Sequence, residues 1–257
     1  MNAFSTCPDE PVLQEALRLI REAEAKGILL RLLGSTAVRV HCYRHAELFE
    51  ALGRPMADLD FITNRTWVRQ MPEFMESQGY EADREVLALF GAERQIYDHP
   101  ATGLHVDLFF DRLSFCHEID LRGRLELDSP TITLADIFLE KLQIVKITGN
   151  DLKDLAILVA EHGIGPDDPE TIDAGRISRV LAQDWGFYHT SMSNLDTLAQ
   201  FVTESTGVKA GVRERILTRI QEIRDRADAE PKSLQWKLRA KIGPRVKWYT
   251  DVDEIRR

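Results

Sequence analysis

Three stretches of the sequence decide the expected fold: ILLRLLGS at residues 28–35, DLDFIT at residues 58–63 and LHVDLFF at residues 104–110. Each contains a short apolar run of the kind that forms a buried strand. The first stretch passes into a Gly-Ser turn that opens an expected helix, from Thr36 towards Leu52. In the third stretch the residues alternate, so that His105, Asp107 and Phe109 are expected on one face and the even-numbered apolar residues on the other.

Helices are expected around these strands and throughout the later part of the chain. Residues 11–26 and 65–77 read as helices, and residues 80–97 are expected to supply further strands. After the turn at residues 128–130, helices are expected from Thr133 to about Ile147 and from Asp151 to His162. We therefore predict an α/β (α+β) domain at residues 10–163, with a mixed sheet flanked by helices, and a mainly helical C-terminal domain at residues 164–257.

The composition is that of a globular protein, with 44% hydrophobic and 29% charged residues. No apolar run approaches the roughly 18 residues that a membrane-spanning helix needs, and the first ten residues lack the basic region of a signal peptide. The cysteines, Cys7, Cys42 and Cys116, show no CxxC spacing and are expected to be free thiols. We expect a cytoplasmic protein with no membrane partner.

The net charge of −9 argues against indiscriminate binding to nucleic acid. Residues 209–257, however, hold 14 Lys and Arg against 8 Asp and Glu, a net of +6, so the rest of the chain carries −15. Trp236, Trp248 and Tyr249 lie within this basic region. The region predicts either RNA or phosphate binding or a helical tail that packs its aromatic side chains inward, and the second reading is favoured.

Gly34 and Ser35 stand where the first strand turns into a helix. A glycine at this point allows a close approach of the backbone, and the amides that follow, with the Ser35 hydroxyl, can hold phosphate oxygens at the helix N-terminus. A Gly-Ser pair is also a common turn, so alone it is a weak signal.

Asp58 and Asp60 are two residues apart on an expected strand and therefore project from one face. Two neighbouring carboxylates are costly without a cation, and Mg²⁺ prefers such ligands together with phosphates. The structural alternative is an acid pair neutralised by Arg54 or Arg65.

Asp107 is a third acid, in the middle of an apolar strand. Three carboxylates that converge on two metal ions would explain all three acids and would support in-line phosphoryl transfer. The alternative is a structural acid near the end of a strand, with its hydrogen bonds made within the protein. Asp111 is a second acid at such a position. His105 is expected on the same face as Asp107, as a core or supporting histidine rather than a metal ligand.

Lys141 interrupts the apolar stripe of the helix expected after Thr133. A lysine at such a position either extends its amine to water or faces a buried anion, of which a triphosphate is one. Asp151 and Asp154 share one face of the next helix and could pair with Lys141 or Lys153.

The order Gly34-Ser35, Asp58-Leu59-Asp60 and Asp107 resembles the DNA polymerase β-type nucleotidyltransferase superfamily. The stretch EKLQIVKITGNDLKDLAIL (140–158) is similar to its AbiEii/MenT-type branch. The stretches at 115–128, 184–195 and 231–245 resemble uncharacterised bacterial proteins of this fold. The spacing from Ser35 to Asp58 is longer than in minimal members.

This resemblance implies a role for each candidate residue. Gly34, Ser35 and Lys141 would bind the triphosphate. Asp58, Asp60 and Asp107 would be catalytic and would hold Mg²⁺, expected as two ions, and Asp107 could help to deprotonate the acceptor.

The function expected from these residues is transfer of a nucleoside monophosphate from an NTP, such as ATP, to a hydroxyl acceptor. The acidity of the chain favours a small-molecule acceptor, whereas the toxin-antitoxin-like branch and the basic tail favour an RNA end or a protein hydroxyl. A nucleotide-binding regulatory module without turnover and a structural partner protein are the other candidates.

Overall fold

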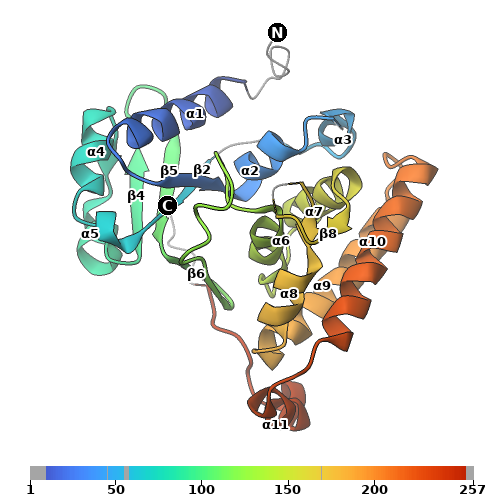
Figure 1. Cartoon of the computed structure of the whole chain (residues 1–257). Helices are drawn as coiled ribbons and strands as arrows, with labels where there is room; N and C mark the ends of the chain where they lie inside the picture. Colours follow the sequence, from blue (N-terminus) through green and yellow to red (C-terminus); the bar gives the residue numbers. More distant parts are fainter. Residues whose placement is uncertain (1–9, 45, 55–57, 169, 253–257) are drawn as a thin grey trace. The chain divides into compact units, whose positions relative to one another are not determined.

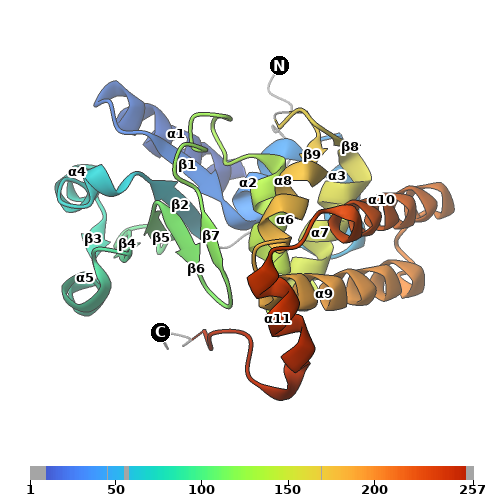
Figure 2. The same ribbon diagram turned by 60° about the horizontal axis from the view of Figure 1, so that its bottom comes forward.

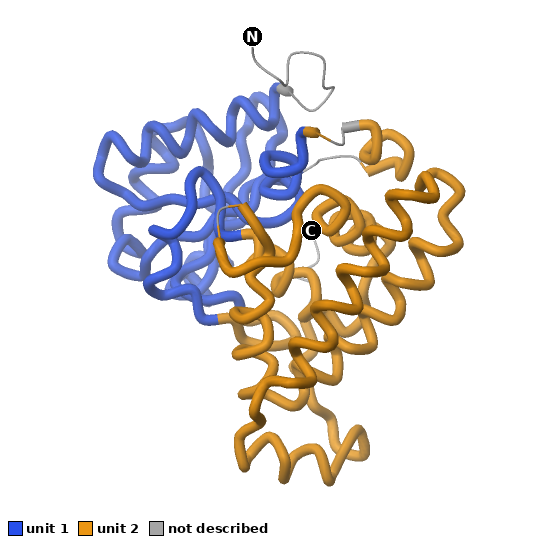
Figure 3. Tube along the Cα trace, turned by 45° about the vertical axis from the view of Figure 1, so that its right-hand side comes forward, with its two compact units in different colours: residues 1–43, 55–113, 120–133 blue, residues 44–54, 114–119, 134–257 orange. Residues whose placement is uncertain are grey.

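The computed structural model describes residues 10–44, 46–54, 58–168 and 170–252 (Figure 1). The chain divides into two compact units, which Figure 3 colours separately. Unit 1 takes in residues 1–43, 55–113 and 120–133, and unit 2 takes in residues 44–54, 114–119 and 134–257. The sequence analysis predicts a division between residues 163 and 164, whereas these units group residues 134–163 with the C-terminal helices.

A mixed sheet of five strands forms the centre of the described part of unit 1, in the order β1 (Leu30–Leu33), β2 (Leu59–Thr63), β5 (His105–Phe110), β4 (Arg94–Asp98) and β3 (Glu81–Ala82). β2 and β5 run parallel, and the other neighbours are antiparallel. The combination of α-helices with a mixed sheet confirms the coarse α/β prediction.

The register of this sheet separates an apolar face from a polar one. Leu32, Phe61 and Leu108 are partners in one row across β1, β2 and β5, and all are buried. The next row pairs Asp60 with Leu33 and with Asp107. Because side chains alternate along a strand, this second row projects from the opposite face. The predicted alternation of β5 is therefore confirmed, and it places two acids side by side.

Helices pack against the strands of unit 1. α1 (Glu10–Ala25) contacts β1, and α2 (Gly34–His41) continues directly from β1 and contacts β1 and β2. α4 (Met71–Ser77) contacts β3, and α5 (Arg84–Phe90) contacts β4, so both lie at that end of the sheet (Figure 2). The backbone of Leu32 bonds to Pro130 and Ile132, so this segment runs beside β1.

Unit 2 is mainly helical. α6 (Leu134–Leu142) is buried at all nine positions and packs against α7 (Gly149–Glu161), α8 (Ala174–Leu181) and α9 (Trp185–Glu204). α10 (Ala210–Ala229) crosses α7, α8 and α9, and α11 (Leu234–Ile242) contacts α9. A helix that is buried on every side needs other elements around it, and α7, α8 and α9 surround α6, so residues 134–163 group with the C-terminal helices. The short elements of the chain are α3 (Ala46–Ala51), β6 (Arg112–Ser114), β7 (Glu118–Asp120), β8 (Ile164–Gly165), β9 (Ile172–Asp173) and the 3-10 turns at Arg65–Trp67 and Gly243–Arg245.

Several expected elements differ from those observed. The helix expected from Thr36 towards Leu52 is two helices, α2 and α3. The one expected at residues 65–77 is a 3-10 turn followed by α4, and the stretch expected to supply strands at 80–97 also contains α5. The helix expected to reach Ile147 ends at Leu142. The Asn194 side chain donates hydrogen bonds to the carbonyl oxygens of Leu142 and Ile144, both at 2.9 Å, and so satisfies groups that the end of the helix exposes. Cys42 and Cys116 are free and buried, as expected, and Cys7 lies outside the described residues.

Candidate functional site

The junction between β1 and α2 brings the Gly-Ser turn against the first acid strand. Gly34 has a left-handed φ of +69°, and a Cβ built there would lie 2.2 Å from Oδ2 of Asp60. A side chain at position 34 is thus excluded both by the backbone conformation and by the Asp60 carboxylate. Leu33 precedes α2 in an extended conformation and makes no side-chain cap. The turn therefore places the start of a helix directly beside Asp60.

The two acids of the Asp58-Leu59-Asp60 motif lie at the start of β2. Leu59 and Phe61 are buried on the apolar face, while Asp58 and Asp60 are partly exposed. Thr36 Oγ1 in α2 donates a hydrogen bond to the carbonyl oxygen of Asp58 at 3.2 Å. α2 therefore holds the beginning of β2, and Ser35, partly exposed in the first turn of α2, lies beside the same junction in sequence.

Asp107 on β5 is brought to this site by the register of the parallel pair. It is the direct partner of Asp60 and is 9% exposed. Its Oδ1 accepts a hydrogen bond from Arg94 Nε at 2.9 Å and forms an ion pair with Arg94 Nη2 at 2.7 Å. Its Oδ2 lies 3.9 Å from Nε2 of His105, whose Nδ1 is 2.8 Å from Asp98 Oδ1. Asp107 thus has an arginine built against it.

Arg94 and Asp98 are the residues of this face that the sequence analysis missed. Both belong to β4, within the stretch whose strands could not be placed from the sequence alone. In the antiparallel register of β4 and β5, Arg94 is opposite Phe109 and Ile96 is opposite Asp107. Only this register puts the Arg94 side chain diagonally next to Asp107. Of the two arginines considered as counter-charges, Arg54 binds Asp154, and the backbone N–H of Arg65 donates to Asp111. The alternative in which an arginine neutralises Asp58 and Asp60 stays open.

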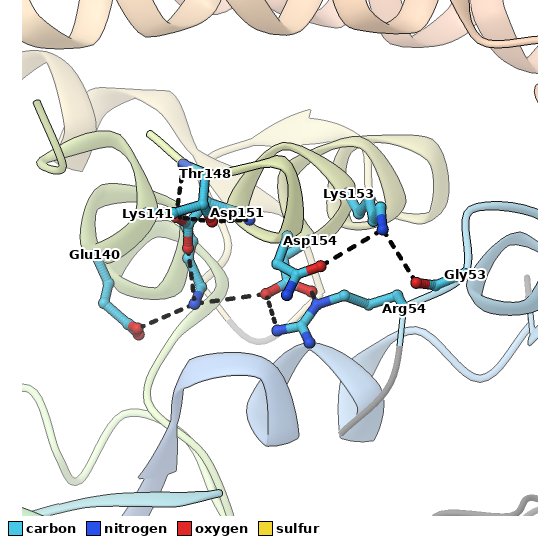
Figure 4. A network of polar contacts seen from close by, with 9 residues as sticks. Gly53, Arg54, Glu140, Lys141, Thr148, Asp151, Lys153 and Asp154 are labelled. Carbon is cyan, nitrogen blue, oxygen red and sulfur yellow. Dashed lines mark hydrogen bonds and ion pairs between the residues drawn. The ribbon is translucent and has the colours of Figure 1, made fainter. Parts of the chain in front are cut away.

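Lys141 lies in unit 2, in the network of polar contacts that Figure 4 shows. Its Nζ is 3.6 Å from a carboxylate oxygen of Glu140 and 3.5 Å from one each of Asp151 and Asp154. The buried anion that faces this lysine is thus a set of carboxylates of the chain itself. The predicted pairing of Lys141 with Asp151 and Asp154 is confirmed, while Lys153 donates to the carbonyl oxygen of Gly53 at 3.0 Å.

Asp154 is the centre of this network. Its side chain is 0% exposed and accepts hydrogen bonds from Arg54, at 2.7 Å from Nε and 2.9 Å from Nη2. The pair is bidentate, which is the strongest form of an arginine–carboxylate contact. The sequence carries no signal for it, because the two residues are 100 positions apart.

The donor set on the polar face of unit 1 suits Mg²⁺ in its chemistry, because Asp58, Asp60 and Asp107 offer only oxygen ligands. The Asp60 carboxylate occupies the space that a side chain at position 34 would need. In the ranges that the structure describes, no group of three or more His, Cys, Asp or Glu side chains is arranged to hold a metal ion. Asp107 is bound to Arg94, and a metal site at the three carboxylates stays a prediction.

The chain matches none of the protein families compared with it, and no curated protein is similar to it. No helix in the described part of the chain is long and apolar enough to cross a membrane.

Proposed function

We propose that the chain is a metal-dependent nucleotidyltransferase that moves a nucleoside monophosphate from an NTP to a hydroxyl acceptor. The observation that carries the proposal is the close contact of three separate motifs in unit 1. The backbone of Gly34 touches the Asp60 carboxylate, and Asp60 is the direct register partner of Asp107. The motifs are far apart in the sequence, so their meeting on the polar face of one sheet supports a common role.

Each residue has a role that follows from its place. Gly34 and Ser35, at the start of α2, would hold phosphate oxygens of the NTP. Asp58 and Asp60 would hold Mg²⁺, which when bound neutralises charge on the phosphates. Oδ2 of Asp107, the oxygen that Arg94 leaves free of contact, would accept the proton of the acceptor hydroxyl. The acceptor oxygen bonds to the α-phosphorus, the bond from that phosphorus to the bridging oxygen breaks, and pyrophosphate leaves.

The proposed acceptor is a small hydroxylated molecule rather than an RNA end or a protein hydroxyl. Trp236 Nε1 donates to the carbonyl oxygen of Leu181 at 3.1 Å, and Trp248 Nε1 donates to Thr190 Oγ1 at 3.0 Å. Both indoles are therefore held against unit 2, as the inward-packing reading predicts. The two tryptophans therefore do not support stacking on RNA bases, and only the positive charge of residues 209–257 favours an RNA acceptor.

The second candidate function is nucleotide binding without turnover, in a regulatory module. The contact between Arg94 and Asp107 favours it, because a metal ion or an acceptor hydroxyl at Asp107 would have to compete with the guanidinium. The role of Lys141 toward a triphosphate stays a prediction, because its amine is surrounded by carboxylates of unit 2.

The first test is calorimetric titration of the purified chain with ATP, GTP, CTP and UTP, each with and without Mg²⁺. We expect Mg²⁺-dependent binding of at least one NTP. We expect Asp60→Asn to weaken this binding by more than about tenfold, because even the loss of a residue that only supports a metal ligand lowers metal affinity by about that factor. Glu81→Gln is the control, since it removes the same charge from an exposed position on β3.

Release of pyrophosphate in the presence of hydroxyl acceptors separates the two functions. Binding with release supports the transferase, and binding without release supports the regulatory module. Failure of the wild-type chain to bind any NTP under either condition contradicts both.

A further inference from the structure

A stripe of apolar side chains is exposed along α11 in unit 2. Leu234, Leu238 and Ile242 recur every four residues and are 75%, 54% and 47% exposed. Side chains four residues apart are neighbours on a helix, so the three form one continuous stripe. The opposite side of α11 packs inward, where Trp236 Nε1 donates to the carbonyl oxygen of Leu181. The stripe is therefore on the outer side of this helix.

Positive charge borders the stripe. Lys237 and Lys241 are exposed, three residues after Leu234 and Leu238, and so lie beside them on the helix surface. Residues 231–250 contain six Lys and Arg and no Asp or Glu. We call the exposed side of α11 the basic face; it consists of Leu234, Lys237, Leu238, Lys241 and Ile242.

A second exposed apolar cluster lies on α5 in unit 1, and its charge has the opposite sign. Leu89 and Phe90 are 67% and 50% exposed. Glu85 is exposed one turn before Leu89, and the backbone N–H of the exposed Glu93 donates to the carbonyl oxygen of Phe90 at 2.8 Å. Residues 81–93 contain four acids against one arginine. We call Glu85, Leu89, Phe90 and Glu93 the acidic face.

The exposed apolar side chains are concentrated rather than scattered. Nine large apolar residues are exposed in the part of the chain that the structure describes, and six of them lie at residues 89–90 and 234–246. Single exposed apolar residues are normal on a protein surface, whereas clusters bordered by polar residues mark interaction sites. Both clusters therefore fit surfaces that a partner covers.

The opposite charges of the two faces identify the partner. RNA would bind the lysines of the basic face but would leave its leucines exposed to water. An anionic membrane would cover the basic face, but it would leave the acidic face exposed and would repel residues 1–208, whose net charge is −15. A second copy of the chain offers an acidic face to a basic face, so that one partner covers both apolar clusters.

We propose that the chain associates with a second copy of itself, through a contact between the basic face of α11 in one copy and the acidic face of α5 in the other. The apolar side chains form the centre of this contact, and the lysines lie against the glutamates at its rim. Because the two faces differ, two copies can use the contact twice around a two-fold axis, or further copies can extend it head to tail. The proposal does not depend on the proposed function.

Sedimentation velocity of the full-length chain at increasing concentration tests the proposal. The contact involves few residues, so we expect reversible association in the range of about 1–100 µM. Salt screens charges near a protein surface, so we expect the association constant to fall by about tenfold or more between low salt and about 0.5 M NaCl.

Substitutions on each face test which surfaces meet. We expect Leu238→Gln on the basic face and Leu89→Gln on the acidic face each to lower the association constant by about tenfold or more. Leu127→Gln is the control and should leave association unchanged, because Leu127 is 43% exposed and belongs to neither face. Circular dichroism verifies that each variant is folded. If either glutamine variant fails to fold, the charge reversals Lys237→Glu and Glu85→Lys replace the pair.

A mixture of the two variants gives the sharpest test. Leu238→Gln keeps an intact acidic face, and Leu89→Gln keeps an intact basic face. We therefore expect the mixture to associate more strongly than either variant alone. Lys237→Glu mixed with Glu85→Lys should behave in the same way.

The remaining outcomes overturn the proposal. A wild-type chain that stays monomeric up to about 100 µM overturns it, and binding of such a monomer to vesicles of phosphatidylcholine and phosphatidylserine would assign the basic face to a membrane instead. Association that Leu238→Gln weakens but Leu89→Gln does not would show that the basic face meets another surface. A mixture that associates no more strongly than its components excludes the contact between the two faces.

Discussion

Gly34 shows how one residue can join two motifs. The Gly-Ser pair is a weak signal in the sequence because it occurs in many turns. In the structure its glycine is required twice, by a positive φ and by the carboxylate of Asp60 above it. The second requirement links the turn to the acid strand, and no sequence pattern reveals it.

Replacement of Gly34 by alanine tests this link, with Gly27→Ala as a matched control. Gly27 has a similar φ of +76°, but a Cβ built there meets no atom within 4 Å. We expect both variants to lose about 1–2 kcal/mol of unfolding free energy from the left-handed conformation. Only Gly34→Ala should also lose binding of Mn²⁺ or NTP, because its Cβ displaces Asp60. Urea unfolding and metal titration measure the two effects, and equal binding by the two variants would contradict the contact.

At the scale of single elements, the start of α9 depends on Asp184. Its side chain accepts hydrogen bonds from the backbone N–H groups of Gly186 and Phe187 and lies 3.7 Å from His117 Nδ1. Desolvation raises the pKa of Asp184, but the contacts with His117 and with the two backbone N–H groups outweigh it, so the pKa lies below its usual value. The carboxylate therefore stabilises the folded state only while it is charged.

Two substitutions separate the cap from the charge. Asp184→Asn keeps a capping side chain, and Asp184→Ala removes it at a cost of about 1 kcal/mol. A lowered folded pKa contributes stability above the unfolded value of about 3.9, and this contribution is lost as the pH falls through the folded pKa. The difference between wild type and Asp184→Asn should thus be present at pH 7, begin to decrease near the unfolded pKa of about 3.9, and vanish only below the lower pKa of the folded state. Thermal unfolding across this range measures it, and a difference that does not change with pH would refute the role of the charge.

At the scale of the whole molecule, the division into units depends on contacts between distant segments. Residues 44–54 are enclosed in the sequence by parts of unit 1 but belong to unit 2. α3 packs against α7, and the bidentate contact between Arg54 and Asp154 fastens the end of this segment to α7 (Figure 4). A buried carboxylate of α7 therefore helps to tie this segment to unit 2.

Asp154→Ala is expected to destabilise unit 2 by about 3–5 kcal/mol, because it leaves two nearly buried cations, Arg54 and Lys141, with less compensation. The control is Asp196→Ala, which breaks an exposed pair with Arg224 and should cost about 0–1 kcal/mol. Three of the four tryptophans belong to unit 2, so their fluorescence during urea unfolding reports this unit. Hydrogen exchange should also increase within residues 46–54, and similar stabilities of the two variants would contradict the prediction.

The sequence alone determined the features that depend on local order. Apolar runs and alternation located the strands that carry Asp60 and Asp107, and they assigned His105 to the face of Asp107, because side chains on a strand alternate whatever lies around it. Periodicity likewise revealed the helical second half of the chain and a lysine on an apolar stripe.

Only the tertiary structure decided which distant residues meet. The register of β4 against β5 places Arg94 on Asp107, and the packing of α3 on α7 brings Arg54 to Asp154. Asn194, which is 52 positions away, donates to the carbonyl oxygen of Leu142 at the end of α6. These contacts depend on strand register and helix packing, which the burial of the whole core determines. A local pattern therefore predicts which way Asp107 points, but not that an arginine of the same chain holds it.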